Sequence, residues 1–103
     1  MEIIDKKWGY EEVIVNLPEY CGKFLNIKKG GRSSVHYHKN KKETFYCIKG
    51  EVMLDVGGHP FVMTEPCTIN PGTPHSFFGR TDAVILEVST HHDDSDVFRL
   101  TES

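Results

Sequence analysis

Short runs of strand-forming residues, broken at close intervals by glycine and proline, occupy most of this chain. The runs are rich in Val, Ile, Phe and Tyr, and the 3.6-residue periodicity of an amphipathic helix does not extend over any long stretch. The runs lie at residues 12–17, 21–31, 33–38, 43–50, 51–63, 67–78 and 83–89. The fifth run turns at a Gly-Gly pair, which predicts a hairpin, and the sixth contains a Pro-Gly turn. Roughly eight or nine short strands of this kind predict an all-β sandwich or a closed barrel.

Size and charge limit the classes of protein to which the chain can belong. A chain of 103 residues, of which 38% are hydrophobic, supports one small core, so we expect a single domain over residues 1–103. The formal net charge of −3 argues against a nucleic-acid partner. No apolar run approaches the length of a membrane span, and the first ten residues lack the apolar run of a signal peptide. We therefore expect neither a nucleic-acid nor a membrane partner.

The three cysteines, Cys21, Cys47 and Cys67, are widely spaced and form no C-x-x-C pair. This use of cysteine argues against a disulfide framework, and each thiol is expected to be a small buried side chain. A reducing compartment fits such a chain best, so we expect a cytoplasmic protein.

Two histidines separated by one residue carry the strongest chemical signal. Successive side chains of a strand point to opposite faces, so His36 and His38 project from one face about 6.5 Å apart along the strand axis. Glu43 begins the next run after a lysine-rich loop, and it faces the same cavity if the two runs are neighbours. The spacing therefore predicts that three polar groups share one side of the sheet.

His75 is a fourth candidate, because it follows a Pro-Gly turn and Pro74, which determine where the next strand begins. Three imidazoles and one carboxylate form a mixed nitrogen and oxygen set that suits Fe, Mn, Ni, Co, Cu or Zn. Such a set can leave positions open for water or substrate. One divalent transition metal ion, of undetermined identity, is therefore the expected cofactor.

The same residues match the sequence motifs of the cupin superfamily. The first cupin motif, G-x5-H-x-H-x4-E-x6-G, is matched at every fixed position by Gly30, His36, His38, Glu43 and Gly50. The second, P-x-G-x2-H-x3-N, is matched at Gly72 and His75, although Pro71 directly precedes Gly72 and Gly79 replaces the asparagine. With the strand pattern between them, the motifs make most of the chain resemble the cupins.

The resemblance implies an antiparallel jelly-roll β-barrel with a metal ion inside its mouth. It implies ligand roles for His36, His38, Glu43 and His75, and it implies a homodimer that pairs through outer strands. Residues 8–30, 36–46 and 86–100 further resemble small cupins of the mannose-6-phosphate isomerase-like and lyxose isomerase groups. That finer resemblance implies a small-molecule substrate, namely a sugar or an anionic sugar derivative.

Glu87 interrupts the apolar run 83–89, and it shares one face of that strand with Ala83, Ile85 and Ser89. If this face points inward, Glu87 is a candidate general acid and base beside the metal. If it points outward, Glu87 is a solvated surface residue, because alternation alone does not say which face is inside.

Two further clusters each allow a functional and a simpler interpretation. Six basic residues could rim the barrel mouth and guide an anionic substrate, or they could lie in solvated loops; they are Lys28, Lys29, Arg32, Lys39, Lys41 and Lys42. A polar group near the carboxyl end could form a second metal site, but consecutive residues diverge, and we expect a surface segment; it comprises His91, His92, Asp93, Asp94 and Asp96.

The sequence favours a metal-dependent isomerase or epimerase that acts on a sugar or a sugar phosphate. In this hypothesis the metal polarises a sugar carbonyl, and Glu87 moves a proton between neighbouring carbons. A non-haem iron dioxygenase and a carbohydrate-binding module without turnover are the alternatives, since both would use the same metal site.

Overall fold

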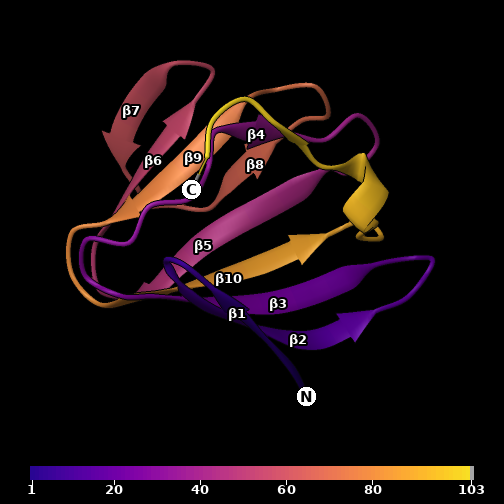
Figure 1. Cartoon of the computed structure of the whole chain (residues 1–103), viewed down its shortest axis with the longest axis horizontal. Coiled ribbons are helices and arrows are strands. Elements are labelled where there is room, and N and C mark those ends of the chain that lie inside the picture. The colour runs from indigo at the N-terminus through magenta and orange to yellow at the C-terminus, as the bar shows by residue number, and fades with distance from the viewer. Residues whose placement is uncertain (103) are drawn as a thin grey trace.

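The computed structural model describes residues 1–102, which form eleven β-strands and one short 3-10 helix (Figure 1). Every strand pair in this part of the chain is antiparallel, as a meander of short strands and tight turns requires. The prediction of an antiparallel all-β fold is confirmed. Among residues 1–102, no helix has both the length and the apolar character needed to cross a membrane.

The described strands form two sheets. The larger sheet has the spatial order β1-β2-β3-β10-β5-β8. Its strands are β1 (Glu2–Lys6), β2 (Gly9–Asn16), β3 (Cys21–Ile27), β10 (Ala83–Ser89), β5 (Glu43–Lys49) and β8 (Cys67–Ile69). The smaller sheet has the order β11-β4-β9-β6-β7. Its strands are β11 (Phe98–Arg99), β4 (His36–Tyr37), β9 (His75–Gly79), β6 (Val52–Val56) and β7 (His59–Val62).

The hydrophobic core lies between the two sheets, because alternate side chains of both sheets point inward. The larger sheet contributes Leu25, Ile27, Phe45 and Ile85, while the smaller sheet contributes Val52, Leu54 and Phe77. Trp8, which precedes β2, packs edge-on against Phe77 with ring centroids 4.9 Å apart. Burial of these apolar side chains, at about 25 cal/mol for each Å² removed from water, is the main force that holds the layers together.

Gly50 ends β5 in a conformation that favours glycine, with φ of 77°. A Cβ atom at this position would also collide with the backbone carbonyl oxygen of Asp82. The turn that separates β5 from β6 therefore requires glycine, which explains its place in the sequence motif.

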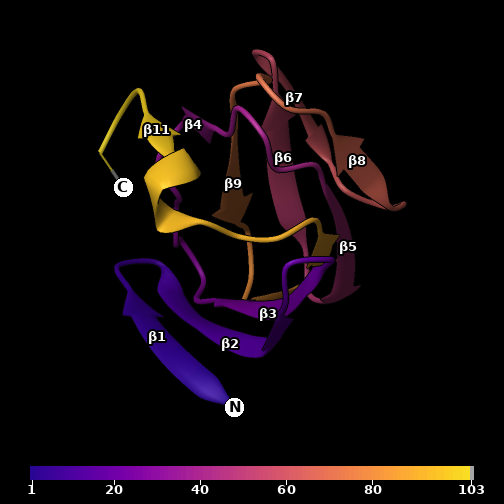
Figure 2. The ribbon, with the colours of Figure 1, turned by 90° about the vertical axis from the view of Figure 1, so that its right-hand side faces the viewer.

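The C-terminal segment, defined here as residues 90–101, connects the two sheets. Figure 2 shows that it leaves β10 in the larger sheet and crosses to the smaller sheet, where β11 pairs with β4. On the way it forms the 3-10 helix η1 (Asp94–Asp96), which Asp93 caps by accepting a hydrogen bond from the Ser95 backbone N–H.

Two strands lie outside the runs expected from sequence. β1 is an edge strand whose exposed positions mix Ile3 with the charged Glu2 and Asp5, so its apolar periodicity is weak. β11 has only two residues, and it exists because β4 provides a partner for it. Neither strand was predicted from the sequence, because pairing with a neighbour, rather than local propensity, makes each of them a strand.

Candidate metal centre and acid–base pair

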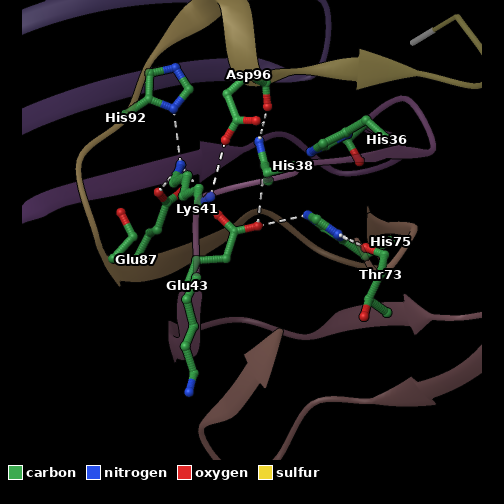
Figure 3. Close-up of polar contacts among 12 residues, drawn as sticks. His36, His38, Lys41, Glu43, Thr73, His75, Glu87, His92 and Asp96 are labelled. Atoms are coloured by element: carbon green, nitrogen blue, oxygen red, sulfur yellow. Dashed lines mark hydrogen bonds and ion pairs between the residues drawn. The ribbon is translucent and has the colours of Figure 1, made fainter. Parts of the chain in front are cut away.

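The structure brings all four expected metal-ligand side chains together at one end of the space between the sheets (Figure 3). His36 lies on β4 opposite His75, the first residue of β9, and His38 follows β4 directly. Glu43 is the first residue of β5, so it reaches the same point from the larger sheet. The shared face of His36 and His38 thus follows from strand alternation, whereas their meeting with His75 depends on sheet pairing.

The candidate ligand atoms are closely spaced. One ring nitrogen from each of His36, His38 and His75 lies within 4.8 Å of the other two. Oε1 of Glu43 lies 2.7 Å from Nε2 of His75 and 3.5 Å from Nε2 of His38. Three imidazoles and a carboxylate at these separations can reach one small cation.

Backbone carbonyl groups orient all three imidazole rings. In each ring, Nδ1 lies 2.9 Å from a backbone carbonyl oxygen. The carbonyl group belongs to Ser34 for His36, to Asp96 for His38 and to Thr73 for His75. A carbonyl oxygen only accepts, so Nδ1 must carry the proton and donate it. In the neutral ring, Nε2 then carries a free lone pair, which is what a metal ligand needs.

Two buried atoms at the centre fit a cation better than they fit each other. Within residues 1–102, Oε1 of Glu43 and Nε2 of His75 have no hydrogen bond of acceptable geometry, despite their 2.7 Å separation. A neutral His75 with its proton on Nδ1 points a lone pair at the carboxylate oxygen, which is repulsive and leaves two buried polar atoms unsatisfied. A bridging cation satisfies both atoms, so the residues present fit a metal ion.

The pKa shifts of these groups are consistent with a cation-binding site. Burial, together with the neighbouring His75, lowers the pKa of His36 to about 4, so this ring is neutral at physiological pH. Burial also opposes charge on His38, but Glu43 outweighs it and raises the pKa of His38. In the same way, His38 and Lys41 overcome the burial of Glu43 and hold its pKa well below the ordinary value.

Glu87 points into the interior, which decides between its two sequence interpretations. Its side chain is buried, and Oε2 lies 2.6 Å from Nζ of Lys41 (Figure 3). Lys41 also lies 3.3 Å from Oε2 of Glu43 and 3.1 Å from Nδ1 of His92. Burial raises the pKa of Glu87 although Lys41 opposes that rise, and Glu87 and Glu43 raise the pKa of Lys41 against its own burial.

Comparison with known proteins agrees with this arrangement. The model of the cupin domain matches residues 23–89, which include all four candidate ligands and Glu87. The chain belongs to the cupin family.

Two curated relatives and one solved structure illustrate the similarity of this cupin to others. Mannose-1-phosphate guanylyltransferase from Klebsiella pneumoniae is 28% identical over 105 residues, which cover 96% of this chain and 22% of the relative. D-lyxose/D-mannose isomerase from Thermosediminibacter oceani is 32% identical over 117 residues, which cover 84% of this chain and 65% of the relative. The cupin thus spans less than two thirds of either relative. An RmlC-like cupin from Shewanella frigidimarina shares the fold, with a TM-score of 0.82, 21% identity and coverage of 91% and 86% of the two chains.

One departure from the cupin motifs has a local cause. Gly79 stands where the second motif has asparagine, and a Cβ atom there would lie 2.8 Å from the Ile27 side chain and 3.0 Å from the Thr81 carbonyl oxygen. Any larger residue would have to displace β3 or the following turn. The substitution therefore affects packing at the far end of β9 and leaves His75 in place.

A cavity of about 190 Å³ is lined by three of the four candidate ligands, His36, His38 and Glu43. Aromatic side chains form part of its wall, and its charged lining has four basic and four acidic residues. The basic residues are Lys6, Lys23, Lys41 and Arg99, and the acidic ones are Glu11, Glu43, Glu87 and Asp94. Lys23 is itself paired with Glu11 at 3.1 Å. The cupin thus encloses a small polar chamber whose formal charge is balanced before any cation binds.

Of the six clustered basic residues, only one faces the cavity, and guidance of an anionic substrate stays a prediction. Lys41 is buried and lines the cavity, whereas the other five are exposed and do not line it. Lys28 and Lys29 follow β3, where its end pairs with the start of β10, and Arg32 bridges to Phe78. These residues lie at the opposite end of the strands, so the cluster in sequence does not form a single rim in space.

The prediction of a surface segment near the carboxyl end holds for His91, Asp93 and Asp94, which are exposed, but not for its other two members. Asp96 is buried and contacts His38, and His92 lines the cavity and contacts Lys41. Within the described residues, one group of side chains, His36, His38 and His75, has the spacing of a metal site, and the polar segment forms no second one. The burial of Lys23, Lys41 and Asp96 was not expected from sequence, because it depends on partners far along the chain.

Proposed function

We propose that this cupin is a metal-dependent isomerase or epimerase that acts on a sugar or a sugar phosphate. The observation that carries the proposal is that a buried acid–base pair, Glu87 and Lys41, lines one cavity with three of the candidate ligands, while the fourth, His75, contacts Glu43. A sugar isomerase needs a Lewis acid for the carbonyl and a proton carrier for the neighbouring carbon, and this cavity offers groups suited to both roles.

In the proposal, His36, His38, His75 and Glu43 hold one divalent transition metal ion. The carbonyl partners of the three Nδ1 atoms support this role, because they hold each Nε2 toward the centre. The bound ion supplies Lewis acidity to the carbonyl of the open-chain sugar.

Glu87 is the proposed proton carrier. Its carboxylate takes the proton from the carbon next to the carbonyl and returns it to the former carbonyl carbon, while the hydroxyl proton of that neighbouring carbon moves in the same direction, to the former carbonyl oxygen. Burial raises the pKa of Glu87, which makes its carboxylate a stronger base. Lys41 holds the carboxylate in place from 2.6 Å.

Size and charge support a small, anionic substrate. The cavity volume of about 190 Å³ is below the roughly 300–1,000 Å³ of pockets for drug-sized ligands, which favours a ligand of monosaccharide size. A divalent ion would shift the balanced lining charge to positive, which favours a phosphate or carboxylate group on the sugar. The D-lyxose/D-mannose isomerase relative supports carbohydrate chemistry of this kind.

We also propose that residues 1–103 act as one cupin domain that forms a homodimer in the cytoplasm. Tyr46 and Ile48 on β5 and Val88 on β10 are 44%, 48% and 51% exposed on the outer face of the larger sheet. An apolar face of this kind favours a second copy of the same sheet. Cys21, Cys47 and Cys67 are free thiols, which fits a reducing compartment.

A turnover assay in D₂O tests the proposed reaction. Protein loaded with Mn²⁺, Co²⁺, Zn²⁺ or Fe²⁺ is incubated with aldoses, ketoses and their phosphates, and ¹H NMR follows product and deuterium at the reacting carbon. Isomerised sugar that carries solvent deuterium is expected from a carboxylate proton carrier. Sugar binding without product would instead support the binding module, and oxygen uptake with Fe²⁺ alone would support the dioxygenase.

A further inference from the structure

The C-terminal segment contacts the metal-ligand strand and its loop along most of their length. Thr90 and Lys42 exchange two hydrogen bonds, since the Thr90 N–H donates to the Lys42 carbonyl and the Lys42 N–H donates to Thr90 Oγ1. Farther along, β11 pairs with β4, and the Leu100 N–H donates to the Val35 carbonyl at 2.7 Å. The segment therefore covers residues 35–42, which carry two of the four candidate ligands.

Asp96 lies at the centre of this contact and uses its carboxylate to hold the loop. Oδ1 accepts from the backbone N–H of Lys39 at 2.9 Å, and Oδ2 accepts from that of Lys41 at 3.0 Å. The Asn40 N–H lies between the two oxygens, 3.3 Å from Oδ1 and 3.1 Å from Oδ2. One buried carboxylate thus satisfies three consecutive amides of the loop that leads to Glu43.

The backbone of the same residue orients a candidate ligand. The carbonyl oxygen of Asp96 accepts the Nδ1 proton of His38 at 2.9 Å, which turns Nε2 toward Glu43 (Figure 3). His36 and His75 take their carbonyl partners from residues two positions earlier, Ser34 and Thr73, which lie just before β4 and β9. His38 is the exception, because its partner belongs to a segment that is distant in sequence.

We propose that Asp96 is a positioning residue that couples docking of the C-terminal segment to ion binding at His36, His38, His75 and Glu43, an inference that rests on the proposed metal site. With Asp96 docked, the His38 ring and the loop from Lys39 to Lys41 are held in the geometry that the ion needs. When the segment detaches, His38 loses its acceptor and the loop loses its common anchor. Coupling is reciprocal, so the ion must also favour the docked segment.

Ion affinity and ligand geometry test the proposal in Asp96→Asn, with Asp93→Asn as the matched control. Asparagine retains one oxygen acceptor. Whichever way its side-chain amide is turned, however, the NH₂ group faces a loop N–H, so that two donors meet. Asp93→Asn removes the same charge from the same turn and keeps a good cap for η1. The readouts are the dissociation constant for Co²⁺ and Zn²⁺, from competition with a chelator, and the d–d absorption spectrum of the Co²⁺ form.

Asp96→Asn should weaken ion binding by about 10-fold to 100-fold and alter the Co²⁺ spectrum, whereas Asp93→Asn should match the wild type. A folded Asp96→Asn protein with a lower Tm but wild-type affinity and spectrum would overturn the proposal, because Asp96 would then be structural only. Failure of the wild type to bind any of these ions would overturn the proposed function as well, so the two failures are distinguishable.

Hydrogen exchange of the wild type keeps the test valid if Asp96→Asn does not fold. Zn²⁺ should slow exchange of the amides of Lys39, Asn40, Lys41 and Leu100, and it should slow tryptic cleavage after Arg99, which releases residues 100–103. Exchange and cleavage that do not change with Zn²⁺, under conditions in which Zn²⁺ is bound, would contradict the coupling.

Discussion

Nζ of Lys41 lies 2.6 Å from Oε2 of Glu87, and both residues are only 4% exposed. Lys41 belongs to the loop before β5, and Glu87 lies on β10, the strand that pairs with β5. The ammonium also faces Glu43 and His92, so one buried cation neutralises two carboxylates beside the candidate metal centre. This arrangement makes Lys41 important for stability as well as for the chemistry of the cavity.

Replacement of Lys41 by methionine should destabilise the protein by about 3–5 kcal/mol, because it leaves two carboxylates buried without their cation. Urea unfolding at pH 7 measures the loss. The control is Lys42→Met, which changes an exposed neighbour and should shift stability by less than about 0.5 kcal/mol. The double variant Lys41→Met/Glu87→Gln should regain part of the loss, and a loss below about 1 kcal/mol in Lys41→Met would contradict the assigned burial.

Glu87→Gln should retain the fold and the affinity for the metal ion while it lowers kcat by at least about 100-fold, because the amide cannot carry the proton. The matched control is Glu51→Gln, which removes an exposed carboxylate paired with Arg80. Steady-state kinetics on the substrate found in the turnover screen measure the effect. Full activity in Glu87→Gln would assign the proton transfer to another group.

The half-buried thiols Cys47 and Cys67 should react slowly with iodoacetamide at pH 7, because burial raises the pKa of each thiol above its ordinary value. The rate should increase about tenfold for each pH unit until the pH exceeds the pKa. Mass spectrometry of alkylated peptides follows each site separately. A rate at pH 7 above that of a small free thiol would contradict this and would reveal an activated cysteine.

The proposed homodimer predicts that a charge on the outer face of the larger sheet separates the subunits. Val88→Lys should convert a dimer to a monomer in light-scattering measurements, since it places like charges near the two-fold axis of the interface. Phe61→Lys provides the control, because Phe61 is an exposed apolar residue on β7 of the smaller sheet. A wild-type monomer, or a Val88→Lys protein that remains dimeric, would show that copies do not pair through this face.

Strand alternation and motif spacing were sufficient to predict the all-β fold and to place His36, His38 and Glu43 on related faces. Alternation could not orient Glu87, because the opposite face of β10 is also apolar. Val84, Leu86 and Val88 point to the outside of the sheet, where two of them are half-buried and Val88 is exposed. A strand with apolar residues on both faces gives no signal for which face is inside.

Local sequence patterns could not predict the roles of Lys41 and Asp96, for a different reason. Lysine in a basic loop and aspartate in an acidic tail both have the appearance of solvated residues. They become buried because the C-terminal segment folds back over the loop from Lys39 to Lys41. Only the long-range pairing of β11 with β4 brings these two polar segments together.

The central claim is that His36, His38, His75 and Glu43 share one divalent cation. Elemental analysis of the purified protein, repeated after incubation with Zn²⁺, Co²⁺, Mn²⁺ or Fe²⁺ and gel filtration, tests it most directly. We predict about one transition metal ion per chain, lost in His75→Ala but retained in His59→Ala, which alters an exposed turn histidine. Less than about a tenth of an equivalent in the wild type under all these conditions, or an equal content in His75→Ala, would contradict the account.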